Sequence, residues 1–448
     1  MAIKQRVLAK LAAIEKEFHV AVETGNLSSL DATREGLETV QGLCHRGLPH
    51  QFSAVYREVF EGIITAVRTL LAGLSKDNPG EVCLLCLELI QGIRENIAGE
   101  NHFKKEIVFL PYQASMWDSM ESVWQAARDD SEHAIAYVVP IPYCDRTPDG
   151  NAAREWHCDI AKFPRYVPMI DYRYIDLEDM HPDAIVIQNP YDNYNLVTSV
   201  DETYYSWNLK KWTDKLVYIP YFVIEEIDPD DEKALENISH FIFQGQGVLN
   251  ADLTVVQSEN MREAYIRLLV KRTDKDRAYW EKRISGLGSP KIDKVLATGR
   301  EDILLPEDWR RVIEKPDGTW KKVILYNVSL SSLMDNKDKL LDKMEWVVQT
   351  FRERRNDVVL LWRPHPLFEA TVESQAPELG ERYRRMVERY RSGGWGIYDD
   401  SSDLHRAIAV SDGYYGDRSS LVTLYQAVKK PVMMQSIRVR EPLFGESV

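Results

Sequence analysis

Residues 357–367 have the sequence DVVLLWRPHPL, in which five consecutive apolar residues are followed at once by Arg363. A short apolar run without polar alternation is typical of a strand that is buried on both faces of a parallel sheet. Pro364 and Pro366 fix their own backbone angles. They also favour extended conformations at Arg363 and His365, so we expect no helix to begin there. The segment therefore predicts a buried strand that ends in a stiff loop carrying a guanidinium and an imidazole.

Apolar runs of the same kind recur on both sides of this segment, and helical patterns or loops lie between most of them. Strands that alternate with helices in this way predict parallel sheets with helices on both faces. A linker-like stretch, GLGSPKIDKVLATG (286–299), divides the runs into two groups, so we expect two doubly wound α/β domains. The other runs are KEIVFLPY (105–112), AIAYVVPIPY (134–143), DAIVIQNPYD (183–192), KLVYIPYFV (215–223), DLTVVQS (252–258), KKVILYNVSL (321–330), GIYDD (396–400), SDGYY (411–415) and KKPVMMQS (429–436).

The first hundred residues have a different pattern, because their apolar positions recur every three or four residues, as in amphipathic helices. We therefore expect a helical bundle over residues 1–101, followed by α/β domains over 102–300 and 301–448. Residues 1–100 hold 10 Lys and Arg against 13 Asp and Glu, a net charge of −3. This charge argues against a basic membrane anchor. The apolar stripes are explained first by packing within the bundle, and pairing of the bundle with itself or with a partner enzyme is the alternative.

The composition excludes several classes of protein. A net charge of −14 argues against a nucleic-acid-binding protein, which needs basic residues to neutralise phosphates. The sequence contains no apolar stretch of about 20 residues and no secretory signal at its start. Its five cysteines are few for 448 residues, which suits a reducing compartment. We therefore expect a protein of the cytoplasm, or of the inner face of the membrane, without a transmembrane segment.

Ligands of open parallel sheets bind beyond the carboxyl ends of the strands, so the residues that follow each apolar run are candidates for a site. Arg363 is suited to bind a phosphate with its two-pronged guanidinium, and His365 to donate a hydrogen bond or a proton. Further along, SDGYYGDRSSLVTLYQAV (411–428) predicts a loop loosened by two glycines, and then a helix that begins at Ser419. A proline that merely ends a strand and a serine that merely caps a helix remain alternatives. Together the two segments fit a pyrophosphate better than either does alone.

A strand that ends in RPHP, followed by a helix that opens with SS after an acidic loop, resembles the CDP-glycerol glycerophosphotransferase family, the teichoic-acid primases and polymerases with a GT-B fold. The HP and SS motifs are also similar to those of transferases that use CMP-activated sugars. DAIVIQNPYDNYN, LVYIPYFV and GSPKIDKV extend the resemblance, which covers about residues 104–435 and leaves out the helical bundle. The fold class is therefore expected to be α/β, a GT-B-like pair of doubly wound parallel-sheet domains behind an N-terminal helical bundle.

The resemblance also implies which residues bind the donor. His365, Ser419 and Ser420 match the residues that contact the donor diphosphate, and Arg363 fits a phosphate role by its chemistry. The family has an acidic residue before its serine pair, for which Asp412 and Asp417 are the candidates. Arg418 stands where the family often has a tyrosine.

The middle domain departs from the family pattern. Family polymerases carry a second histidine there, which removes the proton of the acceptor hydroxyl, but LVYIPYFVIEE (216–226) has none. Tyr221 has an ordinary pKa of about 10, too high for a general base at neutral pH. Asp192, Glu225 or Glu226 would serve if burial raised the pKa of the carboxyl group, although NPYD around Asp192 is also typical of an ordinary turn. The catalytic candidates are therefore His365, Asp192 and Glu225.

The resemblance implies a transferase that moves glycerol phosphate from CDP-glycerol to a hydroxyl of a cell-surface glycan, or of its lipid-linked precursor, in a teichoic-acid-like pathway. No cofactor is expected beyond the cytidine-nucleotide donor. No metal is expected either, because DPDDE (228–232) is typical of a helix start and lacks the spacing of a cation loop. Two alternatives stay open: a glycosyltransferase that uses a CMP-activated sugar of the sialic acid or Kdo type, and a non-catalytic adaptor that binds a cytidine nucleotide.

Overall fold

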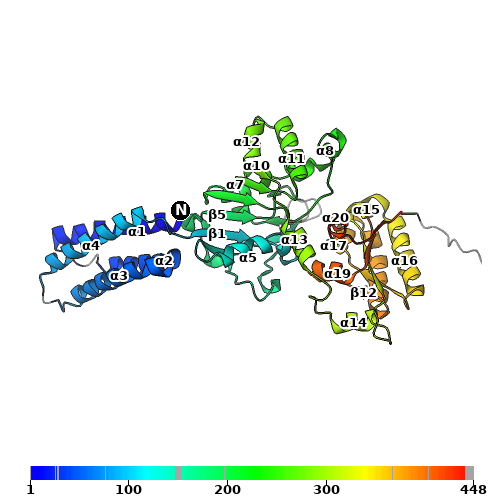
Figure 1. Cartoon of the computed structure of the whole chain (residues 1–448), viewed down its shortest axis with the longest axis horizontal. Helices are drawn as coiled ribbons and strands as arrows, with labels where there is room; N and C mark the ends of the chain where they lie inside the picture. Colours follow the sequence, from blue (N-terminus) through cyan, green and yellow to red (C-terminus); the bar gives the residue numbers. More distant parts are fainter. Residues whose placement is uncertain are drawn as a thin grey trace, which may run out of the picture.

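A computed structural model of the chain describes residues 2–25, 27, 30–75, 77–146, 153–195, 198–365, 367–401 and 403–438. Three parts follow one another along the long axis of the molecule (Figure 1): a helical arm, a middle α/β part and a C-terminal α/β part. The predicted fold class, α/β with two doubly wound parallel sheets behind a helical bundle, is confirmed. Pro366 of the RPHP segment lies outside the described residues.

The arm is a bundle of four antiparallel helices. Their apolar stripes meet in one core that includes Phe18, Phe60 and Ile90. Arg6 pairs with Glu106 of the first strand at 2.5 Å and joins the arm to the middle part. Among the described helices, none is both long enough and apolar enough to span a membrane. The bounds of the four are α1 Ala2–Thr24, α2 Leu30–Gly47, α3 His50–Leu71 and α4 Pro79–Gly99.

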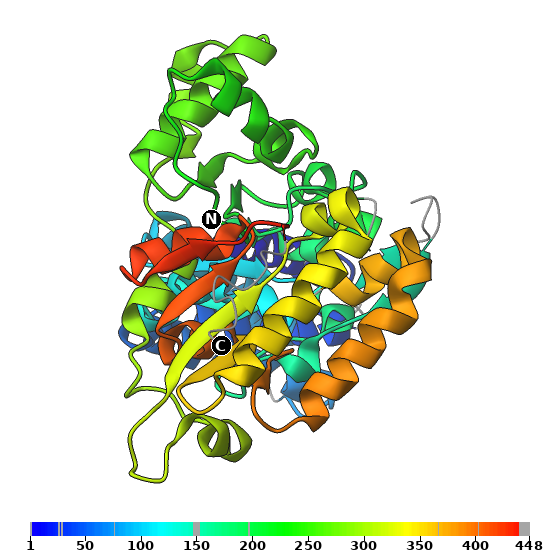
Figure 2. The same ribbon diagram turned by 90° about the vertical axis from the view of Figure 1, so that its right-hand side faces the viewer.

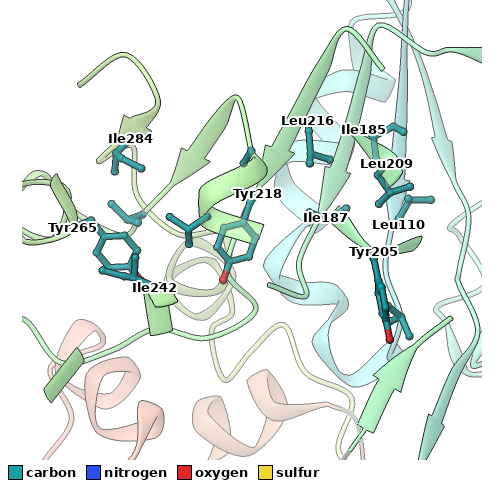
Figure 3. Close-up of a cluster of buried hydrophobic side chains, with 14 of the residues drawn as sticks. Leu110, Ile185, Ile187, Tyr205, Leu209, Leu216, Tyr218, Ile242, Tyr265 and Ile284 are labelled. Atoms are coloured by element: carbon teal, nitrogen blue, oxygen red, sulfur yellow. The ribbon is translucent and has the colours of Figure 1, made fainter. Parts of the chain in front are cut away.

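The middle part is built on a six-stranded sheet in the order β2-β1-β5-β7-β8-β9, and all its strands are parallel. Successive residues of each strand point to opposite faces, and both faces are buried, which explains the continuous apolar runs. On one face, Ile187, Leu216 and Tyr218 pack with side chains from several short helices (Figure 3). The strands are β1 Lys105–Leu110, β2 Ala134–Val138, β5 Ala184–Ile187, β7 Lys215–Tyr218, β8 Leu253–Val255 and β9 Ile284–Ser285.

Phe109, Trp124 and Val186 form a second core on the opposite face of this sheet. The helices of the middle part are the 3₁₀ helices η1 Ala114–Ser119, η2 Ile160–Lys162, η3 Tyr172–Tyr174 and η4 Glu202–Tyr204, and the α-helices α5 Glu121–Asp129, α6 Leu177–Met180, α7 Ser206–Leu209, α8 Glu232–Ile238, α9 His240–Phe243, α10 Gly247–Asn250, α11 Glu259–Arg272, α12 Arg277–Glu281 and α13 Pro290–Ala297.

A small antiparallel sheet, in the order β4-β3-β6, was not expected from the sequence. Its strands are β3 Tyr143–Arg146, β4 Ala153–His157 and β6 Thr198–Val200. β3 follows β2 after a short loop, and β6 lies between β5 and β7 along the chain. The small sheet therefore extends the loops at the carboxyl edge of the main sheet.

The C-terminal part has a five-stranded parallel sheet in the order β12-β11-β10-β13-β14. Leu360 and Trp362 pack on one face beneath α16 and α18, which cross in front of the strands in Figure 2. Leu325 and Leu361 pack on the other face, against α19 and α20. The elements are α14 Glu307–Ile313, β10 Lys322–Asn327, α15 Leu330–Asn336, α16 Asp338–Glu353, β11 Val358–Trp362, α17 Phe368–Gln375, η5 Pro377–Leu379, α18 Gly380–Ser392, β12 Ile397–Tyr398, α19 Leu404–Val410, β13 Gly413–Gly416, α20 Ser420–Ala427 and β14 Val432–Met434.

The loop after β7 belongs to the middle part and contacts the C-terminal part. Val223 on this loop is 2% exposed and shares a core with Leu421 and Val422 of α20. Two residues further on, Glu225 is 3.4 Å from the side chain of Arg418, which follows β13. Because both loops leave the carboxyl ends of their strands, the carboxyl edges of the two sheets meet at this junction.

Candidate functional site

In the C-terminal sheet, the strand order reverses between β10 and β13, the kind of position where open α/β sheets bind ligands. Three loops that leave carboxyl ends are tied together there. The backbone carbonyl of Asn327, at the end of β10, accepts a hydrogen bond from the Asp417 N–H at 3.1 Å. The side-chain amide of Asn327 donates to the Arg363 carbonyl at 2.9 Å. The loops after β10, β11 and β13 therefore form one connected edge, which carries His365, Asp417 and the serine pair.

Arg363 is 9% exposed, and its guanidinium is already bound within the chain. It pairs with the buried carboxylate of Asp399 and donates to the Ser401 carbonyl at 2.8 Å. Asp399 follows β12, the neighbour of β11, so the pair joins two strand ends. The structure thus places Arg363 where it orders the loops of the site, with little of its surface left for a phosphate.

His365 is half-buried on the loop after β11. Its Nδ1 accepts a hydrogen bond from the Leu367 N–H at 3.1 Å. Burial lowers the pKa of His365 to about 4, so the imidazole is neutral at neutral pH. With Nδ1 acting as acceptor, the proton of the neutral ring lies on Nε2. The residue can therefore donate one hydrogen bond to a ligand oxygen.

Ser419 and Ser420 lie at the start of α20. Ser419 is in the cap position, but its hydroxyl makes no capping hydrogen bond and lies 3.4 Å from the Tyr414 hydroxyl. Ser420 is exposed in the first turn. The two hydroxyls are donors of the kind that bind anions, and they lie at the positive end of the helix dipole.

The two acidic candidates of the C-terminal part lie at opposite ends of the sheet. Asp417 belongs to the site, where it accepts from the Ser329 N–H at 2.9 Å and from the Gln435 side chain at 2.6 Å. Asp412 lies 3.3 Å from Lys322, the first residue of β10, and 3.4 Å from Arg300. At about 3.3 Å per strand residue, Asp412 is roughly 16 Å from the carboxyl edge. It therefore does not join the other donor-binding candidates.

The sequence suggested that the two glycines before the serine pair loosen a loop, but in the structure both belong to a strand. Gly413 and Gly416 are the end residues of β13. A Cβ atom at Gly416 would lie 2.0 Å from the Asn327 carbonyl oxygen. The absence of a side chain therefore lets β13 approach β10 closely at the site.

Asp192 follows β5 and is 1% exposed. Burial raises the pKa of its carboxyl group to about 6, the direction that a general base requires. Its two oxygens, however, accept hydrogen bonds from the Ser206 N–H at 2.8 Å and the Ser206 hydroxyl at 2.5 Å. Ser206 in turn accepts from the Asn250 side chain at 2.8 Å. The carboxylate is thus directed at α7 and not at the C-terminal part.

The two glutamates of the β7 loop differ in their surroundings. Glu226 accepts hydrogen bonds from three side chains, those of Gln257, Ser258 and Asn260, at 2.8 to 3.0 Å. Glu225 is exposed and faces Arg418 of the C-terminal part. Of the carboxylates considered as bases, Glu225 is therefore the one that reaches the loop of the serine pair.

Three tyrosines lie at the carboxyl edge of the middle sheet, and only Tyr221 among them was a candidate from the sequence. Tyr112 follows β1, Tyr191 follows β5 and Tyr221 follows β7. The ring centre of Tyr221 is 6.3 Å from that of Tyr112 and 6.5 Å from that of Tyr191. Burial raises the pKa of each phenol, so all three keep their protons at neutral pH. Their common position after three neighbouring strands was the signal in the sequence that could have identified them.

A small pocket opens beside this cluster, between the loops after β7 and β8. It is lined mainly by apolar side chains, with the polar side chains of Gln257, Ser289 and Tyr265 among them. Within the described residues, no group of three or more His, Cys, Asp or Glu side chains is arranged to hold a metal ion.

Comparison with known proteins identifies no family, because no family model and no curated protein matches the sequence. One similar solved structure is the UDP-GlcNAc 2-epimerase from Methanocaldococcus jannaschii with UDP-GlcNAc and UDP, with a TM-score of 0.44 and 10% identity, covering 73% of this chain and 83% of that chain. Another is the UDP-GlcNAc 2-epimerase from Neisseria meningitidis with UDP-GlcNAc, with a TM-score of 0.42 and 10% identity, covering 73% of this chain and 81% of that chain. An α,α-trehalose-phosphate synthase (UDP-forming) from Burkholderia vietnamiensis is similar with a TM-score of 0.35 and 11% identity, covering 75% of this chain and 83% of that chain. Because these TM-scores are below 0.5, the functional case rests on the residues of the chain itself.

Proposed function

We propose that the chain is a transferase that binds a cytidine diphosphate donor at the carboxyl edge of the C-terminal sheet. The donor that the sequence resemblance favours is CDP-glycerol, and the acceptor is a hydroxyl of a glycan or of its lipid-linked precursor. The observation that carries the proposal is the position of His365, Ser419 and Ser420 on two loops that Asn327 ties together where the strand order reverses. These are neutral donors of the kind that stabilise phosphate oxygens.

In the proposed reaction, the acceptor hydroxyl oxygen attacks the phosphorus atom that carries glycerol. The bond from this phosphorus to the bridging oxygen breaks, and CMP leaves with the bond electrons. Transfer of this kind depends mainly on the positions of the reactants and on stabilising the charge of the phosphoryl oxygens. His365 would stabilise a non-bridging oxygen as a hydrogen-bond donor, and the proton of the acceptor hydroxyl would pass to Glu225, the exposed carboxylate of the facing loop.

Release of CMP tests the proposal. The protein is incubated with CDP-glycerol or with a CMP-activated sugar, each with and without a glycan acceptor. We expect CMP from CDP-glycerol, and a loss of at least about a hundredfold in rate for His365→Ala, because the removal of one oxyanion donor typically costs that much. His133→Ala is the control, since His133 is exposed on the middle part and pairs with Asp130.

The other outcomes separate the alternatives. If CMP is released only from the CMP-activated sugar, the reaction at this site is glycosyl transfer and not the transfer of glycerol phosphate. A cytidine nucleotide that binds without turnover of either donor would indicate an adaptor. Failure of the wild-type protein to bind any cytidine nucleotide in calorimetry would refute the proposal.

A further inference from the structure

Arg418, which directly precedes the serine pair, differs from the other basic residues of the site. Among the described residues on the loops after β10, β11 and β13, the basic side chains are those of Arg363, His365 and Arg418. The guanidinium of Arg363 is buried against Asp399, and His365 is neutral at neutral pH. The Arg418 side chain is 79% exposed, so its charge remains accessible to a ligand.

The charge balance of this edge depends on Arg418. Arg363 and Asp399 cancel, His365 contributes nothing, and Asp417 adds one negative charge, so these four side chains sum to −1. A diphosphate carries at least two negative charges and would be repelled by that sum. Arg418 brings the edge to neutrality, and its planar guanidinium can bind two phosphate oxygens at once.

In this structure, Arg418 is paired with a carboxylate of the middle part. The Arg418 Nε lies 3.4 Å from a side-chain oxygen of Glu225, whose side chain is 48% exposed. Exposed ion pairs of this kind contribute little, because both charges remain solvated. A diphosphate bound at the serine pair can therefore displace Glu225 at small cost.

We propose that Arg418 is the cationic residue that binds the donor diphosphate. Without the donor, Arg418 pairs with Glu225 of the middle part, and the bound diphosphate replaces Glu225 as its partner. The inference rests on the proposed function, since it concerns the same site. It reassigns the phosphate role that the sequence gave to Arg363. The exchange also frees the Glu225 carboxylate at the moment the donor arrives, when a base is required.

Calorimetric titration with CDP and with inorganic pyrophosphate tests the proposal on the full chain. We expect Arg418→Ala to weaken CDP binding at least about tenfold, because hydrogen bonds to charged groups contribute that much. Arg418→Lys should recover only part of the loss. Glu225→Gln should strengthen binding by up to about fivefold, because it removes the competing carboxylate.

The matched controls are Arg384→Ala and Glu373→Gln, which break an exposed pair of similar geometry, 3.2 Å, between α18 and α17 of the same part. They should leave CDP binding unchanged. Equal CDP affinity of wild type and Arg418→Ala, or weaker binding by Glu225→Gln, would overturn the inference while leaving the proposed function intact. Binding of pyrophosphate that depends on Arg418, without any turnover of cytidine donors, would support the inference and refute the function. Wild-type protein that binds neither probe would refute both.

Discussion

At the scale of single residues, the burial of His365 controls the protonation state of its imidazole. The folded-state pKa of about 4 lies below the ordinary 6.5, so the unfolded chain binds a proton that the folded chain excludes. The contribution of this residue to the free energy of unfolding is therefore intact above about pH 6.5 and is lost as the pH falls toward 4, by on the order of 3 kcal/mol in all.

Urea unfolding of wild type and His365→Asn at pH 7.5 and pH 5 measures this effect. We expect the wild type to lose stability relative to the variant at the lower pH, because only the wild type must keep the imidazole neutral. His19→Asn, at an exposed position of the arm, is the control. If the difference between wild type and His365→Asn is the same at both pH values, the imidazole is not buried as described.

The site residues also show what a sequence can reveal and what it cannot. The positions of His365, Ser419 and Ser420 follow from strand ends, which apolar runs locate. The partner of Arg363 could not be predicted in this way, because Asp399 is 36 residues away and reaches Arg363 only through the pairing of β11 with β12. Asp412 is close to the serines in sequence, but the length of β13 places it at the other edge of the sheet. Strand order and direction, which no local pattern encodes, decided both cases.

At the scale of elements, a buried ion cluster joins η1, α13 and α19. Lys291 lies 2.6 Å from both oxygens of Asp118, and His405 Nε2 is 3.0 Å from one of them. Each of the three residues is at most 8% exposed. Although burial alone would raise it, Lys291 and His405 hold the pKa of Asp118 at about 2.

We expect Asp118→Asn to cost about 3 to 5 kcal/mol of unfolding free energy, because it leaves Lys291 charged and unpaired in a buried position. The double variant Asp118→Leu with Lys291→Met should cost less than the single one, since no buried charge is then left without a partner. Urea midpoints at pH 7 measure both. A loss below about 1 kcal/mol for Asp118→Asn would contradict the description of the cluster as buried.

Elements were predictable from the sequence where both faces of a strand are buried. The strands of the two parallel sheets carry continuous apolar runs, because side chains on both faces enter a core. The small antiparallel sheet was missed for the opposite reason. Its strands YCDR, AREWH and TSV mix polar and apolar residues and give no run to detect.

At the scale of the whole molecule, the arm has a core of its own, and it is joined to the sheet by the Arg6–Glu106 ion pair and by Ile135 of β2, which packs against the arm core. The arm core consists of residues from α1 to α4 together with Leu48 and Phe103. Glu106 of β1 is 2% exposed, and its charged partner is Arg6 of α1, at 2.5 Å. The Tyr137 hydroxyl also approaches Glu106, at 3.3 Å. The arm can therefore loosen from the sheet and keep the packing among its own helices, provided that Arg6 releases Glu106 and Ile135 leaves the arm core.

Arg6→Ala tests this separation of the arm from the sheet. The change leaves a buried carboxylate with a single neutral donor, so we expect a loss of about 3 kcal/mol and faster amide exchange at the start of α1, the end of α4 and β1. Exchange in the middle of α2 and α3 should stay as in the wild type, because the arm core is untouched. Arg57→Ala, which removes an exposed pair with Glu61 at 3.9 Å in the same bundle, should cost less than about 1 kcal/mol. Hydrogen exchange read by mass spectrometry distinguishes the cases: faster exchange throughout the arm would mean that its helices depend on the sheet for their stability.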